Sequence, residues 1–372
     1  MGQGQRISLR RRAAVIALLL VLIAMPLLAG SRQSLAAGAA GADRFAFVSL
    51  RAGEMQIYSI DADGQGERRL TVPPGQNVIP VWSPDGRQIA FVKRQGEDSQ
   101  IHVMNADGSA RRRLTSPSGS ATFPAWSPGG SRLAFVSTRV GEPQIYVMNR
   151  DGKAQRRLTG PPGFSTVPVW SPDGRHIAFV STRDNAVPEL YVMNADGTSP
   201  RRLTEPDRYV TNPSGKGEKQ LGAVGGVLLR PGVLHPAWAP DGRSIAYVTR
   251  VGLAEQAIYT VRVDGTGRRR ITTGYSPAWS PDGRRIALVV ARVGDAQIYV
   301  MNADGSAAMR LTPGGVHLLP AWSPDGHRIA FISSRAGDLA LWVMDPDGRN
   351  QHRLAPVAGD FSVLPVFSWK PR

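Results

Sequence analysis

The stretch WSPDGRQIAFV, from Trp82 to Val92, decides the fold of this chain because close copies of it recur along most of its length. Within it, Ser-Pro-Asp-Gly is a strong turn signal, since proline presets the backbone and glycine closes the turn. The apolar run IAFV after the turn is typical of a buried strand. The copies begin at Trp82, Trp126, Trp170, Trp238, Trp279 and Trp322.

The repeating unit is roughly 44 residues long, which is the length of one four-stranded propeller blade. A second turn marker, Asp-Gly, recurs in every unit. In the unit of Trp82 we expect strands rich in Val, Ile, Phe and Thr that end at Gly, Pro, Asn or Asp. These strands are predicted over 80–83, 88–93, 100–105 and 112–115.

Seven copies of the apolar second strand are present, and the first lacks a preceding tryptophan strand. Leu364–Ser368 matches Leu319–Ser323, with Phe367 in the tryptophan place. The C-terminal strand is therefore predicted to complete the blade that the N-terminus begins, which removes two open sheet edges. We predict an all-β fold, a seven-bladed β-propeller of four-stranded blades; six or eight blades would require a different register.

The first 42 residues differ in composition from the rest. Basic residues precede an uncharged apolar run over 13–30, and small residues follow over 34–42. This order predicts an export signal peptide or an N-terminal membrane anchor. The propeller is then expected over 43–372, outside the cytoplasm, in the periplasm or an equivalent compartment.

The composition of the chain limits the kinds of site and partner that it can have. The chain has no cysteine, which excludes disulfides and thiolate sites, and a net charge of +16, which favours anionic partners. Export argues against nucleic acid as that partner. No nucleophile elbow, phosphate-binding loop or paired histidine metal motif is present. We therefore expect no catalytic residues, no metal and no cofactor.

The order P-x-W-SPDG, IAFVS-x-R, IYVMNADG, RRLT resembles the repeat of TolB-type propellers and recurs across residues 44–369. This resemblance implies an exported, non-catalytic scaffold that works by binding proteins of the cell envelope. Two features depart from TolB, which carries an α/β domain before a propeller of six blades. Only the export segment precedes the first blade here, and seven blades are counted, so TolB's own partners are not carried over.

Binding is expected on the face of the loops between second and third strands, where the repeats vary most. A long crossing at 205–235 interrupts the repeat there. A loop of this length in a compact fold is either functional or idle and mobile. We consider it a candidate lid or docking loop.

One arginine of every unit falls in the same loop, and together these residues form either an anion-binding ring or a set of structural pairs. They are Arg51, Arg94, Arg139, Arg183, Arg250, Arg292 and Arg335. The residues that open the first strands are expected to surround the channel entrance, either as a recognition surface for an apolar segment or as simple packing. They are Ile79, Phe123, Val167, His235, Ser276, Leu319 and Leu364, with Tyr275 beside them.

The preferred interpretation is a monomeric scaffold that binds an envelope protein through the channel mouth and the inserted loop. The alternative is a propeller that binds a carbohydrate or a small anionic ligand, with an enzyme site in the central channel as one form of it. His235, Tyr275 and the arginines would then supply the contacts. Under the first hypothesis, deleting the insertion should abolish binding. Under the second, substituting His235 and Tyr275 should do so.

Overall fold

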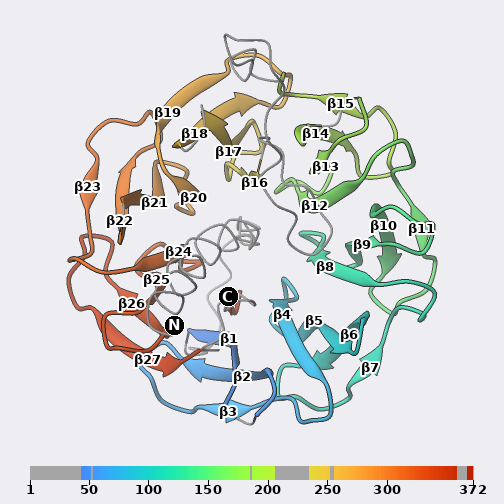
Figure 1. Ribbon diagram of the computed structural model, residues 1–372, viewed down its shortest axis with the longest axis horizontal. Coiled ribbons are helices and arrows are strands. Elements are labelled where there is room, and N and C mark those ends of the chain that lie inside the picture. The colour runs from blue at the N-terminus through green and yellow to red at the C-terminus, as the bar shows by residue number, and fades with distance from the viewer. Residues whose placement is uncertain are drawn as a thin grey trace, which may run out of the picture.

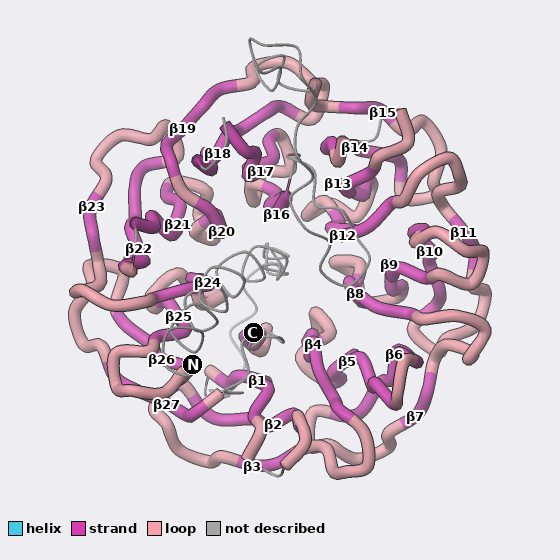
Figure 2. The backbone as a smooth tube through the Cα atoms, in the orientation of Figure 1, coloured by secondary structure: helices cyan, strands magenta, loops and turns pink. Residues whose placement is uncertain are grey.

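Seven four-stranded antiparallel sheets stand around a central axis, as Figure 1 shows. The computed structural model describes residues 43–51, 53–184, 187–205, 234–251, 255–292, 294–357 and 367–371. These residues contain strands and loops and no helix, as the tube in Figure 2 makes clear. The predicted seven-bladed all-β propeller is confirmed. The export segment and most of the 205–235 insertion lie outside the described residues.

The innermost strand of each blade ends at a tryptophan and lies closest to the axis (Figure 1). From blade 2 through blade 7 and back to blade 1, these strands are β4 (Gln76–Trp82), β8 (Ala121–Trp126), β12 (Ser165–Trp170), β16 (Leu234–Trp238), β20 (Tyr275–Trp279), β24 (His317–Trp322) and β28 (Phe367–Trp369). The second strands carry the apolar run and are almost fully buried. From blade 1 to blade 7 they are β1 (Arg44–Ser49), β5 (Gln88–Gln95), β9 (Arg132–Ser137), β13 (His176–Ser181), β17 (Ser244–Val251), β21 (Arg285–Arg292) and β25 (Ile329–Ser333).

The third strands pack against the neighbouring blade. They are β2 (Gln56–Asp61), β6 (Asp98–Asn105), β10 (Gln144–Asn149), β14 (Glu189–Asn194), β18 (Glu255–Arg262), β22 (Asp295–Asn302) and β26 (Ala340–Met344). The outermost strands are short, exposed and mostly basic, which discourages edge-to-edge pairing. They are β3 (Arg68–Arg69), β7 (Arg112–Arg113), β11 (Arg156–Arg157), β15 (Arg201–Arg202), β19 (Arg269–Thr273), β23 (Met309–Arg310) and β27 (His352–Pro356).

Local chemistry explains the turns that join these strands. In blade 2 the Gly86 amide donates to the Ser83 carbonyl at 2.8 Å, and Asp85 accepts from the Ser83 hydroxyl. The second turn follows the same logic, because Asp107 accepts from the backbone amide of Ser109 at 2.9 Å. Both aspartates are therefore turn residues, as their sequence context predicts.

Tryptophans join every blade except blade 2 to the one before it. The indole Nε1 donates to the carbonyl of the residue that precedes the tryptophan of the previous blade, over 3.0 to 3.2 Å. The rings themselves are buried between the blades. This repeat-encoded bond connects Trp126 to Val81, Trp170 to Ala125, Trp238 to Val169, Trp279 to Ala237, Trp322 to Ala278 and Trp369 to Ala321.

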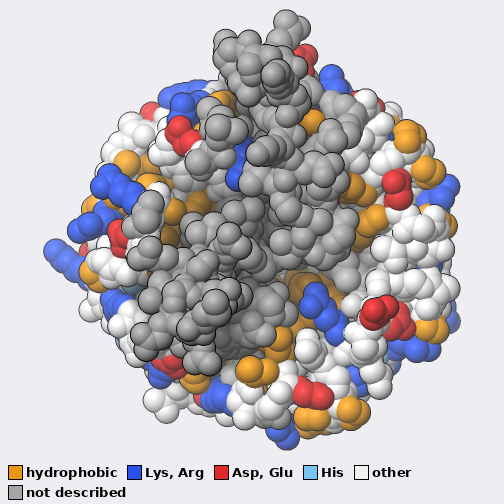
Figure 3. Space-filling model, in the orientation of Figure 1, with side chains coloured by type: hydrophobic (Ala, Val, Ile, Leu, Met, Phe, Trp, Pro, Cys, Tyr) orange, Lys and Arg blue, Asp and Glu red, His pale blue; other side chains and the backbone are white. Residues whose placement is uncertain are grey.

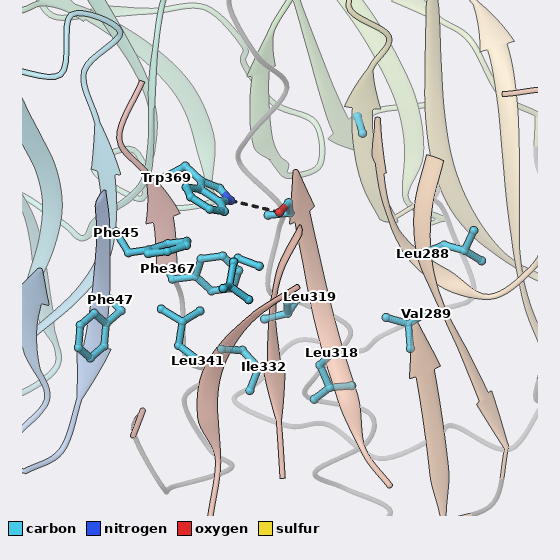
Figure 4. Close-up of a cluster of buried hydrophobic side chains, with 14 of the residues drawn as sticks. Phe45, Phe47, Leu288, Val289, Leu318, Leu319, Ile332, Leu341, Phe367 and Trp369 are labelled. Atoms are coloured by element: carbon cyan, nitrogen blue, oxygen red, sulfur yellow. Dashed lines mark hydrogen bonds between the residues drawn. The ribbon is translucent and has the colours of Figure 1, made fainter. Parts of the chain in front are cut away.

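The C-terminal strand β28 closes the ring by pairing with β1, as expected, but its predicted register is wrong. Trp369 lies opposite Phe45, where we had placed Phe367, and donates to Ala321 (Figure 4). A shift of two residues keeps every side chain on the same sheet face, so the alternation of the sequence does not detect it. Trp369 takes this place because its indole N–H donates to the Ala321 carbonyl. A phenylalanine side chain has no donor for that bond.

Candidate functional site

A bulge interrupts every innermost strand whose full length is described. In blade 2, Val78 pairs with Val92 and Val81 with Ala90, so Ile79 and Pro80 together oppose Phe91. Ile79 takes a left-handed backbone with φ of 54°. For a β-branched residue this conformation is unusual and costs about 1–3 kcal/mol. The same geometry recurs at Phe123, Val167, Ser276 and Leu319.

The predicted mouth residues at these bulges fall into two groups that differ in burial. Ile79, Phe123 and Val167, on blades 2 to 4, are only half-buried, although each also packs on a core cluster. Ser276 and Leu319, on blades 6 and 7, are buried. The accessible apolar side chains therefore lie on three consecutive blades and not around the whole ring.

Two predicted mouth residues cannot be placed in this way. The side chain of His235 and the whole of Leu364 lie outside the described residues. The corrected register also moves the position three residues before the closing tryptophan from Leu364 to Val366, which is likewise outside them.

The innermost strands of blades 6 and 7 carry buried polar groups that have no hydrogen-bond partner. Tyr275 Oη and Ser276 Oγ on β20, and His317 Nδ1 on β24, have no hydrogen-bond partner. Burial raises the pKa of Tyr275 and lowers that of His317, so both stay neutral at pH 7. The His317 Nε2 atom contacts the Pro313 carbonyl at 3.0 Å. Sequence reasoning missed His317, because its position in the repeat holds a different residue in each of several blades.

Four of the seven arginines predicted in the loops fold back onto their own blade. Each lies over the aromatic ring of its third strand, at 3.8 to 5.8 Å from the ring centre. Cation–π contacts of this kind hold the guanidinium in place. The pairs are Arg51 with Tyr58, Arg139 with Tyr146, Arg183 with Tyr191 and Arg335 with Trp342.

Hydrogen bonds complete this arrangement, which we call the arginine clamp. Arg139 donates to Gln155 at 2.9 Å, and Gln155 donates in turn to the Leu114 carbonyl of blade 2. Arg335 and Gln351 repeat the pattern toward Leu311 of blade 6. These two clamps therefore tie blade 3 to blade 2 and blade 7 to blade 6.

Arg94, Arg250 and Arg292 are placed differently, because they belong to strands β5, β17 and β21 and not to loops. Among the described residues, their side chains make no hydrogen bond, ion pair or ring contact. Burial lowers the pKa of Arg94. The seven arginines thus divide into four that fold onto their own blade, two of which also link it to the blade before, and three on extended hairpins.

The described residues contain no metal centre and no membrane-spanning helix. No group of three or more His, Asp or Glu side chains in them has the geometry to hold a metal ion. No helix in this part of the chain has the length and apolar character needed to cross a membrane. Basic side chains are spread around the rim of the disc, as Figure 3 shows.

Comparison with protein families gives one match, the TolB beta propeller domain, over residues 37–121, 109–221 and 229–370. A search of curated protein sequences finds no match.

Solved structures with the same fold belong to several classes of protein. TolB from Acinetobacter baumannii is 21% identical with a TM-score of 0.55, over 75% of this chain and 66% of that one. An oligogalacturonate lyase in complex with manganese is 16% identical with a TM-score of 0.63, over 81% and 85% of the two chains. A puromycin-hydrolyzing peptidase of Mycobacterium tuberculosis is 18% identical with a TM-score of 0.62, over 84% and 53%. At these identities the likenesses show the fold alone.

Proposed function

The chain belongs to the TolB β-propeller domain family, and from this membership we propose that it is an exported, non-catalytic scaffold that binds a protein of the cell envelope. Its resemblance to TolB-type repeats supports partner binding over catalysis. The basic and apolar composition of residues 1–42 supports export, either as a cleaved signal or as an anchor.

One observation carries the proposal: the half-exposed apolar side chains of Ile79, Phe123 and Val167 on three adjacent innermost strands. They are held by bulges with positive φ, so their positions are set by the backbone of a rigid ring. Strained backbone of this kind persists where the surrounding structure imposes it, and bulges re-aim side chains at binding sites. A rigid apolar strip of this form suits an apolar peptide segment of a partner.

The inserted crossing at 205–235 connects blade 4, which carries Val167, to blade 5. It leaves blade 4 after β15 and returns to blade 5 at β16, next to the blade that carries Val167. We propose that residues 205–235 extend the recognition surface beyond the strip.

A binding experiment tests this function. Partners are captured from envelope extracts with the exported chain, and the affinity of each purified candidate is then measured by calorimetry. Ile79→Ser combined with Val167→Ser should weaken a true partner at least about tenfold, or 1.4 kcal/mol, because both changes remove apolar contact area. Serine is less strained at positive φ than a β-branched residue, so the backbone of both bulges should be retained.

Met309→Ser is the matched control, because Met309 is an exposed apolar side chain on the outermost strand β23. Unchanged affinity in the double serine variant would overturn the proposed surface. A variant with 205–235 shortened separates the contribution of the insertion from that of the strip.

A second candidate function rests on the unpartnered Tyr275, Ser276 and His317 groups, which favour a small polar ligand such as a carbohydrate. Buried polar atoms without partners are rare in folded proteins and are common where a ligand completes the bonding. Tyr275→Phe and His317→Phe should then abolish sugar binding in a calorimetric screen while leaving partner capture intact.

A further inference from the structure

The seam between blades 1 and 2 lacks the tryptophan bond of the six other seams and an arginine bond found at four of them. Trp82 Nε1 has no partner, although the six equivalent tryptophans each donate to the preceding blade. The arginine that opens the outermost strand also reaches the next blade's Asp-Gly turn elsewhere, as when Arg112 donates to the Asp151 carbonyl at 2.8 Å. Arg156, Arg201 and Arg269 do the same. Arg68 makes no such bond to Asp107, although it holds the equivalent position.

A cavity of about 310 Å³ lies where these bonds are missing. This volume is at the lower end of the range for small-molecule sites. Trp82 and Ser59 line it and are buried, with exposed fractions of 3% and 0%. Arg68 and Asp107 also line it and are exposed, so the cavity runs from solvent to a buried base.

Two buried polar atoms of the lining residues are unsatisfied. These are the Trp82 Nε1, which is a donor, and the Ser59 hydroxyl oxygen, which both donates and accepts. Native proteins bond the large majority of such atoms. Two of them beside one cavity indicate that an acceptor from outside the chain completes the seam.

The charge of the lining selects the kind of acceptor. Arg44 is paired with Asp61 at 2.7 Å, whereas Arg68 and Lys370 form no ion pair within the described chain. With Asp107 included, the lining holds three cations and two carboxylates, an excess of one positive charge. A monoanion balances this excess, while a phosphate dianion would be repelled by the two carboxylates.

We propose that this seam cavity is a binding site for a small monocarboxylate. The ligand carboxylate accepts hydrogen bonds from the Trp82 indole and the Ser59 hydroxyl, and Arg68 and Lys370 balance its charge. The site lies at the Asp-Gly turn of blade 2, includes no bulge residue of the proposed partner strip, and is independent of that function. Binding there would join the closing blade to its neighbour, so the ligand would also stabilise the ring where the chain ends meet.

The test uses the indole N–H signals of the full chain in ¹⁵N NMR, with sodium propionate as the probe. The Trp82 signal, identified by its loss in Trp82→Phe, should shift saturably at about millimolar propionate. The Trp126 indole is the internal control, because it already donates to Val81. Propionamide, which has the same shape without the charge, should produce no saturable shift.

Two variants sharpen the result. Arg68→Gln should weaken propionate binding at least about fivefold. Arg112→Gln, at the equivalent place in the next blade, should leave it unchanged, because that arginine already bonds its neighbour. The proposal is overturned if Trp82 does not move up to about 50 mM propionate, if propionamide binds equally well, or if inorganic phosphate binds more tightly.

Discussion

Blades 3 and 6 carry almost the same loop and use it in opposite ways. Blade 3 has Arg139-Val-Gly-Glu and blade 6 has Arg292-Val-Gly-Asp, in the same place of the repeat. In blade 3 the strand stops at Ser137, and Arg139 folds onto Tyr146 as a clamp. In blade 6 the hairpin continues until Arg292 pairs with Asp295, and the arginine stays exposed.

The residue that separates the two outcomes comes directly after the apolar run of the second strand, one or two positions before the arginine. All four clamp blades have a buried serine there, namely Ser49, Ser137, Ser181 and Ser333. The serine hydroxyl accepts from the arginine that follows, from the backbone amide in three blades and from a guanidinium in blade 1. Such local bonds compete with strand pairing and end the strand.

The extended hairpins have Lys93, Thr249 and Val290 in place of this serine. Lysine and valine lack a hydroxyl, and threonine is β-branched and favours the strand. One side chain therefore decides whether a repeat arginine folds back onto its own blade or continues the hairpin.

The largest effect that tests this comparison is expected at the ring beneath a clamp. Tyr146→Ala should lower the free energy of unfolding by about 3 kcal/mol, because it removes a buried aromatic side chain together with its arginine contact. Tyr299→Ala, at the equivalent position of blade 6, should cost clearly less, since Tyr299 is only partly buried and holds no arginine. Urea denaturation measures both, and equal losses would contradict the clamp.

A pH effect of about 1–2 kcal/mol should come from the extended hairpin of blade 2, where His102 replaces the clamp tyrosine. Burial, with Lys93 and Arg113 nearby, lowers the pKa of His102 to about 4. The unfolded chain takes up a proton near pH 6.5 and the folded chain only near 4, so stability should fall as the pH drops from 6.5 to 4.

His102→Phe isolates this effect. The variant should lose that part of the pH dependence when Tm is followed from pH 7 to 4, whereas Tyr146→Phe, in a clamp blade, should leave the slope as it is. An unaltered slope in His102→Phe would show that the histidine is already protonated in the folded chain.

Replacing the clamp serine of blade 3 with valine should lower the free energy of unfolding by about 1 kcal/mol. Ser137→Val removes two hydrogen bonds to Arg139, from its amide at 3.3 Å and its guanidinium at 3.1 Å. The freed arginine should then exchange amide and side-chain protons faster, as NMR would detect. The reverse change, Val290→Ser, should slow the exchange of the Arg292 side chain, and its failure to do so would mean that serine alone does not form a clamp.

The smallest effect is expected for the arginines themselves. Arg139→Met should destabilise the protein by about 0.5–1 kcal/mol, through its ring contact and its bond to Gln155. Arg292→Met should change stability by less than about 0.5 kcal/mol, because the side chain is exposed and unpaired. Thermal unfolding of the two variants side by side would refute the comparison if their Tm values shifted alike.

The sequence predicts which positions of the repeat form the candidate site, but not which of their side chains are accessible. The position of the apolar mouth residues follows from the repeat, yet their division into accessible Ile79, Phe123 and Val167 and buried Ser276 and Leu319 depends on the neighbouring blades. His317 carries no repeat signature, so only its burial without a partner for Nδ1 marks it. The clamp serine was visible in the motif IAFVS-x-R, but its meaning required the contact with the arginine.

The amino-acid sequence by itself determined the blades, their number and their turns, because turn chemistry and strand alternation act within a few residues of each other. Only the tertiary structure decided the closing register, since Phe367 and Trp369 lie on the same face of the strand and a bond to Ala321 chooses between them. The seam of blades 1 and 2 is decided in the same way. Trp82 has the same residue as every other seam and Arg68 the same residue as four of them, yet neither makes the bond that its equivalents make.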